Sequence, residues 1–183
     1  MRYAGSQAMN HDPFTHDQEA AAASELHRLL NGFQLAQAIH VAAVLGVADH
    51  MASTPRSSDD LAAAVGAHPG ALYRLLRALA AFGVFHETPH REFELTPLGR
   101  CLRSDATQPV RPYALFAAEA SQWSAWGALL HSVKTGENAF RAVHGMDVWQ
   151  HRAAHPEQNA LFNAAMTGNS RRVDRAVVEA CAL

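Results

Sequence analysis

The sequence predicts a mostly α-helical protein with a winged-helix-like domain, a small β-hairpin wing and additional C-terminal helices. Three observations predict this fold class. Alanine, the residue with the highest helix propensity, recurs along the whole chain of 183 residues. Residues that start or end helices punctuate the sequence at short intervals. Two short segments in which hydrophobic and polar residues alternate then follow the fourth expected helix, in the position of a wing.

The charge balance and the cysteines restrict the classes of function. The chain has 15 basic and 17 acidic residues and a formal net charge of -2 at pH 7. It therefore lacks the positive charge of a typical nucleic-acid binder, and we expect no such partner. Cys101 and Cys181 lie far apart without a metal-binding motif, which favours a reducing, cytoplasmic location. Residues 1–17 lack a continuous apolar core and are expected to be a disordered leader.

The first two helices are expected over residues 18–30 and 33–51, because Asn31 and Gly32 both favour the end of a helix. Residues 29–48 contain no charged side chain, and about 20 apolar residues would span a membrane. Several polar side chains in this run argue against a membrane segment. A helix that is apolar on nearly every side is otherwise buried between helices, so we expect a second subunit to cover it.

The next segments predict a helix-turn-helix. Ser57 followed by Asp60 resembles a capping box and starts a short helix that Gly66 ends. Pro69 suits the first turn of the following helix. In that helix, four leucines recur with the spacing of a stripe that faces the core: Leu72, Leu75, Leu76 and Leu79.

The wing follows directly. Residues 84–87 and 92–95 alternate in hydrophobicity and are expected to pair as a hairpin. Thr96 and Pro97 combine an N-cap with a proline at the first helical position, and they open a short helix to about residue 103. The order helix, helix, turn, helix, hairpin is that of a winged helix.

The sequence divides into a winged-helix domain over residues 18–104 and a helical region over residues 105–183. A long helix is expected over residues 112–134, and its side chains are too aromatic for a solvated surface. Asp147 caps a short helix, and Pro156 opens the last one.

Three runs of residues resemble a known family. They read FQLAQAIHVAAVLGVAD over residues 33–49, FELTPLG over 93–99 and FNAAM over 162–166. In this order and spacing they resemble the plant-type and bacterial antibiotic-pathway O-methyltransferases that use S-adenosylmethionine. The resemblance implies that the N-terminal helices interlock in a homodimer, and that the winged helix joins the dimer core rather than DNA. It also implies that the aromatic helices cap the pocket of a small aromatic acceptor.

The chain departs from that family in one respect. In the family, a strand and a glycine-rich loop follow this region and hold the methyl donor. No two of the 11 glycines here lie closer than Gly66 and Gly70, so no G-x-G-x-x-G loop exists. The resemblance therefore implies that the Rossmann domain for S-adenosylmethionine and the catalytic histidine are absent from these residues. We expect no bound cofactor and no methyl transfer by this chain alone, and whether it is an enzyme stays open.

The resemblance also implies a set of site residues. On the last helix, Phe162 and Met166 match positions that touch acceptor or donor, and Asn169 and Ser170 continue this surface toward the cofactor. Trp123 and Trp126 could line the acceptor pocket by stacking. For each apolar residue, packing in the core is the alternative. No catalytic residue and no metal ligand is assigned.

Two other types of site were weighed. His151 and His155 are four residues apart, as metal ligands on one helix face would be, but Pro156 predicts a helix boundary there and no third ligand is evident. Arg74 and Arg77 lie where a DNA-binding winged helix contacts bases. The acidic wing opposes that function, because it would repel phosphates.

Three hypotheses about function follow. The first is the dimerisation and acceptor-capping region of an S-adenosylmethionine-dependent O-methyltransferase of aromatic secondary-metabolite biosynthesis. The second is a stand-alone protein that kept the fold and acts as a binding module, a partner subunit or a non-methylating catalyst. The third is a winged-helix regulator that binds DNA.

Overall fold

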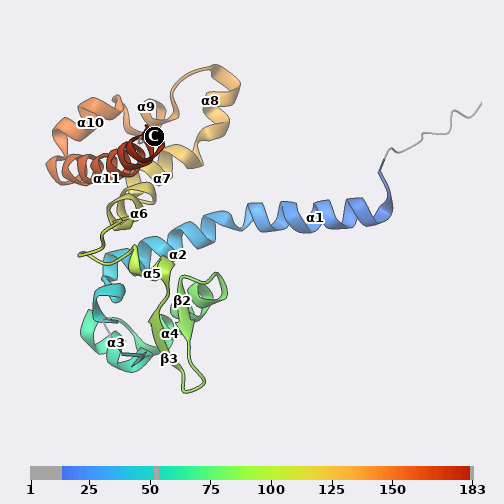
Figure 1. The fold of residues 1–183 in the computed structure, drawn as a ribbon. Helices are drawn as coiled ribbons and strands as arrows, with labels where there is room; N and C mark the ends of the chain where they lie inside the picture. Colours follow the sequence, from blue (N-terminus) through green and yellow to red (C-terminus); the bar gives the residue numbers. More distant parts are fainter. Residues whose placement is uncertain (1–13, 52–53, 182–183) are drawn as a thin grey trace, which may run out of the picture. The chain divides into compact units, whose positions relative to one another are not determined.

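The computed structural model describes residues 14–51 and 54–181, without the side chains of residues 172–180. The chain forms two units, Met1–Gln34 and Leu35–Leu183. Among the described residues, helices predominate and a three-stranded antiparallel sheet lies in the second unit (Figure 1). This confirms the prediction of a mostly α-helical, winged-helix-like fold with further C-terminal helices.

Helix α1 spans His16–Leu30 in the first unit. Its start is set by a capping box, in which the Thr15 side chain accepts from the Gln18 backbone N–H and the Gln18 side chain accepts from that of Thr15. The helix therefore begins two residues before the predicted position 18. Of the predicted leader, residues 1–13 lie outside the described residues, while residues 15–17 form the cap and first turn. Asn31 caps the C-terminus, as the sequence predicts.

The predicted helix over residues 33–51 is wrong at its end. Helix α2 spans Gly32–Leu45, and a 3-10 helix, η1, spans Val47–His50. Gly46 lies between them with a φ of 66°, a left-handed conformation that ends the α-helix and that glycine adopts without strain. Within the described ranges, no helix combines the length and the hydropathy that a membrane crossing needs.

The helix-turn-helix forms as predicted. Helix α3 spans Ser58–Val65, and its cap residue Ser57 accepts a hydrogen bond from the backbone N–H of Asp60. Gly66 ends it in the left-handed conformation. Helix α4 spans Pro69–Ala81 and buries three of the four predicted leucines, whereas the remaining one is half-buried. The buried leucines are Leu72, Leu76 and Leu79.

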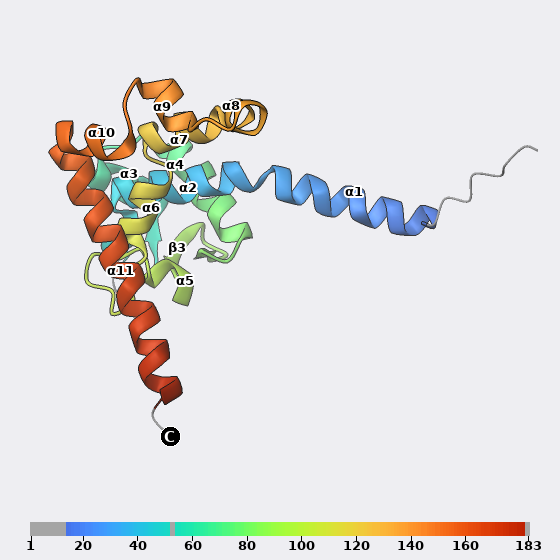
Figure 2. The same ribbon diagram turned by 90° about the horizontal axis from the view of Figure 1, so that it is seen from above.

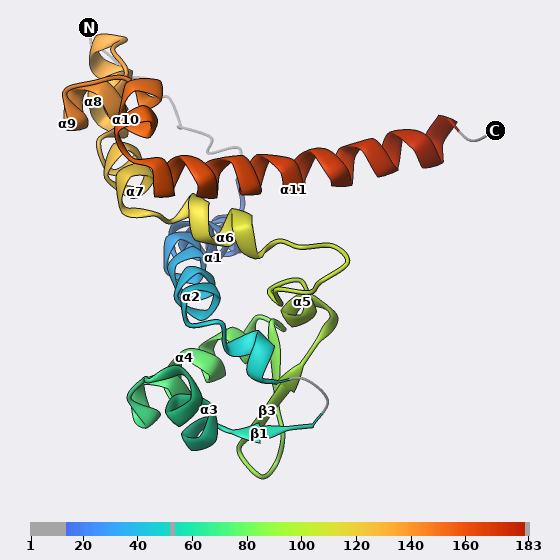
Figure 3. The same ribbon diagram turned by 90° about the vertical axis from the view of Figure 1, so that its left-hand side faces the viewer.

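The wing contains one strand more than the sequence predicts. Strands β2, Phe85–Glu87, and β3, Glu92–Leu95, form the predicted hairpin. Strand β1, Arg56–Ser57, pairs antiparallel with the other edge of β3 (Figure 3). Two residues are too few to show an alternating pattern, so the sequence carries no signal for this strand. Phe85 and Phe93 are fully buried and join the leucines of α4 in the core.

Helix α5 spans Pro97–Arg100, so it ends before the predicted residue 103. Thr96 is its N-cap and accepts from the backbone N–H of Gly99. The Thr96 hydroxyl lies 2.7 Å from the carbonyl oxygen of Val84, to which it can donate, and this contact ties the start of α5 to the start of the wing.

The predicted helix over residues 112–134 is divided into three helices. They are α6, Arg111–Ala117, α7, Ala120–Gly127, and α8, Leu129–Thr135. Glu119 has an extended backbone between the first two, and its carboxylate accepts a hydrogen bond from the Ser121 hydroxyl. No glycine or proline marks this break in the sequence, so residue propensities could not predict it.

The remaining helices pack against this series. Helix α9 spans Ala139–His144, and α10 spans Val148–Ala154 behind the predicted cap Asp147. Helix α11 spans Pro156–Cys181 and opens at the predicted proline. It packs along α6 and contacts α10 (Figure 2 and Figure 3). These three helices place the aromatic residues described below.

A charged network joins η1 to the start of α6. One oxygen of the Asp49 carboxylate lies 2.6 Å from the Arg111 guanidinium, and the other accepts from the backbone N–H of Ser104 at 2.8 Å. Arg111 also donates to the carbonyl oxygen of Ala43. The Asp49 and Arg111 side chains are 28% and 23% exposed, so water only partly screens the pair.

We expect Asp49→Ala to lower the free energy of unfolding by about 2 kcal/mol, because the Ser104 N–H then loses its acceptor and the half-buried Arg111 loses its counter-ion. Urea denaturation of both chains measures this difference. Asp59→Ala removes an exposed carboxylate from the first turn of α3 and is expected to change the same quantity by less than about 1 kcal/mol. Equal effects of the two changes would contradict a specific role for Asp49.

Candidate functional site

Four aromatic rings from three helices form a cluster around Phe162 of α11. The centroid of the Phe162 ring lies 5.5 Å from that of Phe116 on α6 and 6.0 Å from that of Trp149 on α10. Tyr113, one turn before Phe116, extends the series at 6.3 Å. Both contacts of Phe162 are edge-to-face, the geometry that aromatic pairs favour. We call Tyr113, Phe116, Trp149 and Phe162 the aromatic cluster.

A cation lies within this cluster. The Arg152 guanidinium carbon is 3.4 Å from the centroid of the Phe162 ring, with Trp149 at 5.1 Å and Phe116 at 5.8 Å. Arg152 is 9% exposed, and burial lowers its pKa from the ordinary value. Contacts of this kind are attractive because the negative face of the ring meets the cation.

A hollow of about 340 Å³ opens beside the cluster. Its lining comes from the loop before α6, from α6 and from the middle of α11: Gln108, Pro109, Val110, Tyr113, Gly168 and Asn169. A Cβ atom at Gly168 would lie 3.4 Å from the carbonyl oxygen of Pro109. Tyr113 belongs to both features, so aromatic surface continues into the wall of the hollow.

The predicted site residues fall into two groups. Phe162, Met166, Asn169 and Ser170 lie on consecutive turns of α11, where Phe162 joins the aromatic cluster and Asn169 lines the hollow. Met166 is half-buried and Ser170 is exposed.

The two predicted tryptophans belong to another helix of the second unit. Trp123 and Trp126 are on α7, the former half-buried and the latter 67% exposed. In the described part of the chain, the ring contacts of Phe162 are to Phe116 and Trp149 instead. Sequence reasoning did not select the i, i+3 pairs Tyr113 with Phe116 and Trp149 with Arg152, although this spacing places both members on one helix face.

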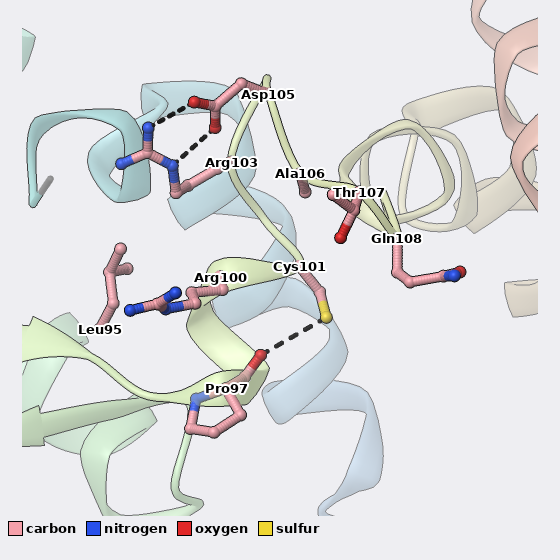
Figure 4. Close-up of a pocket in the computed structure, with 9 residues that line it drawn as sticks. All are labelled: Leu95, Pro97, Arg100, Cys101, Arg103, Asp105, Ala106, Thr107 and Gln108. Atoms are coloured by element: carbon pink, nitrogen blue, oxygen red, sulfur yellow. Dashed lines mark hydrogen bonds and ion pairs between the residues drawn. The ribbon is translucent and has the colours of Figure 1, made fainter.

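A second, larger hollow of about 560 Å³ lies near the wing and α5 (Figure 4). Its two charged side chains from the loop, Arg103 and Asp105, are joined by two hydrogen bonds of 2.7 Å. Cys101 turns its thiol toward the carbonyl oxygen of Pro97 at 3.5 Å. Arg100 also lines this hollow, which contains no aromatic side chain.

Comparison with known proteins relates this chain to O-methyltransferases. A family model described as the O-methyltransferase dimerisation domain matches residues 27–105. A phenazine O-methyltransferase of Lysobacter antibioticus is 41% identical over 157 residues, which are 86% of this chain and 46% of that relative. The chain matches the N-terminal dimerisation region of O-methyltransferases.

Solved structures of O-methyltransferases share the fold. The mitomycin 7-O-methyltransferase matches with a TM-score of 0.78 at 39% identity, over 85% of this chain and 46% of that one. An O-methyltransferase from neocarzinostatin biosynthesis, in complex with S-adenosylmethionine and 2-hydroxy-5-methyl naphthoic acid, matches with a TM-score of 0.63 at 32% identity, over 74% and 42%. The present chain spans about half the length of the curated relatives it matches.

Three histidines from α9, from α10 and from its C-cap gather beside Phe140. The His151 ring stacks on that of His155 at 4.1 Å and lies 4.9 Å from that of His144. His155 Nδ1 can donate to the carbonyl oxygen of His151 at 2.7 Å, and His144 Nε2 to that of Ser121 at 3.1 Å. Although these rings lie close together, no three His, Cys, Asp or Glu side chains in the described ranges are placed so that they could hold a metal ion.

The pKa of His151 lies below its ordinary value of 6.5. Burial is the largest cause, the neighbouring His155, His144 and Arg152 lower the pKa further, and Glu119 raises it. The folded protein therefore favours the neutral form of His151. An unfolded chain takes up a proton at this side chain at a higher pH than the folded one does, so His151 reduces stability as the pH falls below 6.5.

We therefore expect His151→Gln to make the protein less sensitive to acid. Between about pH 7.5 and about pH 5.5, the free energy of unfolding should fall less in the variant than in the wild type. Urea denaturation at both pH values measures this change. His90→Gln, at an exposed position in the wing turn, serves as the control and should leave the pH dependence as it is in the wild type. A wild-type pH dependence in His151→Gln would contradict the effect of burial.

Proposed function

We propose that this chain is the dimerisation and acceptor-capping region of an S-adenosylmethionine-dependent O-methyltransferase that acts on a small aromatic acceptor in secondary-metabolite biosynthesis. The observation that carries the proposal is the aromatic cluster beside an open hollow, on a chain that matches the dimerisation region of O-methyltransferases. A flat acceptor ring can stack on such rings or meet them edge-to-face. The naphthoic acid in the neocarzinostatin enzyme is an acceptor of this shape.

The proposed homodimer forms through the N-terminal helices. None of the 15 residues of α1 is buried, although helices of this length are marginal in water without packing. Its large exposed apolar side chains recur with the spacing of one helix face, and we call them the α1 stripe: Leu26, Leu29 and Leu30. Because the matched dimerisation domain begins at residue 27, within this stripe, we propose a second copy of the chain as its partner.

The residues of the site take different parts in this proposal. Phe162 and Met166 contact the acceptor, and Trp123 and Trp126 border it from α7. Asn169 and Ser170 offer polar side chains that would touch the methyl donor from the side of this region. A complete donor site needs more than these two, because the 183 residues contain no glycine-rich loop to approach it. We therefore propose that this chain alone does not bind S-adenosylmethionine and does not transfer methyl groups.

A cytoplasmic location belongs to the same proposal. Cys101 and Cys181 are both free thiols, as expected in a reducing compartment.

Replacing the central ring of the cluster tests acceptor binding. We expect Phe162→Ala to raise the dissociation constant of the neutral probe 4-hydroxybenzamide at least about tenfold. The reason is that the aromatic ring of the probe loses the Phe162 ring as its contact surface. Ligand-observed saturation-transfer NMR titration measures the dissociation constant. Phe82→Ala removes a ring that is 57% exposed at the end of α4, and it should leave the constant unchanged. The same weakening in both variants would contradict a site at Phe162.

Calorimetry completes the test. Titration of the purified chain with S-adenosylmethionine should give no saturable heat. Tight stoichiometric uptake would contradict the proposal that this chain lacks a donor site.

A further inference from the structure

Arg152 is a buried cation without an anionic partner. Three other arginines, Arg28, Arg103 and Arg111, each pair with a carboxylate at 2.6 to 2.7 Å. Within residues 14–51 and 54–171, the guanidinium of Arg152 has ring contacts but neither an ion pair nor a hydrogen bond. Burying a charge without such a partner destabilises the folded protein, because the charge loses its hydration. We therefore expect the unpaired Arg152 to serve a function.

The donors of Arg152 stay accessible. A guanidinium carries five N–H donors in a planar fork. Gln158 Oε1 is the one side-chain atom among the described residues that is both enclosed and unpaired. The unpaired Arg152 nitrogens are not in this class, so each keeps some exposed surface. Three aromatic rings lie 3.4 to 5.8 Å from the guanidinium carbon and restrict its position.

An acidic side chain in the same crevice does not neutralise Arg152. Glu119 lines the same narrow crevice, but its carboxylate accepts a hydrogen bond from Ser121. Its charge acts on the pKa of His151, whereas burial alone shifts the pKa of Arg152. The fork of Arg152 is thus free to bind an external anion.

We propose that Arg152 binds the carboxylate of an aromatic acid whose ring packs on the aromatic cluster. This rests on the proposed function of the cluster as an acceptor site. A planar guanidinium matches a carboxylate through two parallel hydrogen bonds, and the Phe162 face keeps its plane fixed. The arrangement selects acceptors that carry both a flat ring and a negative charge, and it places the acid group of the ligand beside α10.

The thermal stability of an Arg152 variant distinguishes a binding role of this side chain from a structural one. A buried unpaired charge that serves binding makes the empty protein less stable than an apolar side chain of similar length would. Arg152→Met keeps the length of the stem and removes the charge. We expect its melting temperature to equal or exceed that of the wild type. A purely structural role of Arg152 predicts a clear decrease instead.

The binding experiment compares two probes with the same ring and hydroxyl group, 4-hydroxybenzoate and 4-hydroxybenzamide. Saturation-transfer NMR on the purified chain should show the acid binding about tenfold more tightly than the amide. Arg152→Met should bind both alike, and Arg152→Lys should keep part of the preference because it retains the charge but not the fork. Arg141→Gln, at an exposed position on α9, is the matched control and should keep the whole preference.

The outcomes separate the two proposals. Equal binding of acid and amide by the wild type, lost in Phe162→Ala, overturns the role of Arg152 and leaves the acceptor site standing. An acid preference that survives Arg152→Met assigns the carboxylate to another cation and also overturns it. The absence of saturable binding of either probe contradicts the acceptor site, and the role of Arg152 with it.

Discussion

Gly99→Ala is expected to lower the free energy of unfolding by about 3 kcal/mol, which corresponds to a decrease of roughly 10 °C in melting temperature. A Cβ atom at this position would lie 2.5 Å from the carbonyl oxygen of Val84 and 3.2 Å from the Phe85 ring. The first of these is a backbone atom and Phe85 is fully buried, so neither can move aside without disturbing the wing. Thermal unfolding followed by circular dichroism measures the effect.

A second glycine provides the control. Gly127 at the end of α7 has no other atom within 4 Å of the position that a Cβ would take. The same substitution there, Gly127→Ala, should leave the melting temperature unchanged or raise it slightly, because alanine favours the helix. A wild-type melting temperature for Gly99→Ala would show that α5 can move away from the wing at little cost.

The largest effect on assembly is expected from the double change Leu26→Glu and Leu30→Glu in the α1 stripe. Burial of one leucine side chain contributes about 1.5–3 kcal/mol, and in a twofold dimer each change occurs twice. The dimer dissociation constant should therefore rise by at least about a thousandfold. Helix α1 should also lose helicity, because 15 residues without packing are marginal in water.

Analytical ultracentrifugation over a range of protein concentrations measures this constant. The double change Ala21→Glu and Ser24→Glu adds the same charge to the opposite face of α1, where the residues are also exposed. This control should stay dimeric. Dissociation of both double variants would point to charge repulsion rather than to loss of the stripe.

The sequence predicts elements well where a single residue determines a boundary. Gly66 and Pro69 mark the turn between α3 and α4, and Asp147 marks the start of α10. Each of these residues acts through its own backbone conformation or its own side-chain hydrogen bond. Such local causes are visible without knowledge of the fold.

One error has a local cause, because Gly46 ends α2 inside a run of apolar residues that reads as one helix. The other errors arise where packing decides. The break at Glu119 has no local signal, and it is held by contacts with Ser121 and, through the Ser121 carbonyl, with His144 of α9. Strand β1 exists because β3 offers it an edge. None of these contacts between distant segments can be read from propensity.

For the site residues, too, the sequence predicts what depends on one segment and misses what depends on contacts between segments. The resemblance selected Phe162 as part of the motif at residues 162–166, and Asn169 because it continues the same surface of this helix. It did not select Arg152, because only the folded structure shows that α10 places this side chain over the Phe162 ring. A single arginine in a helical sequence reads as a solvated side chain, and only its burial among aromatic rings distinguishes it from the others.

The central claim is that two copies of this chain associate through their N-terminal helices. Sedimentation equilibrium of the purified wild-type chain at micromolar concentration tests it most directly. We predict a single species of twice the 19.8 kDa mass of one chain. A stable species of 19.8 kDa at that concentration, with α1 still helical, would contradict the claim.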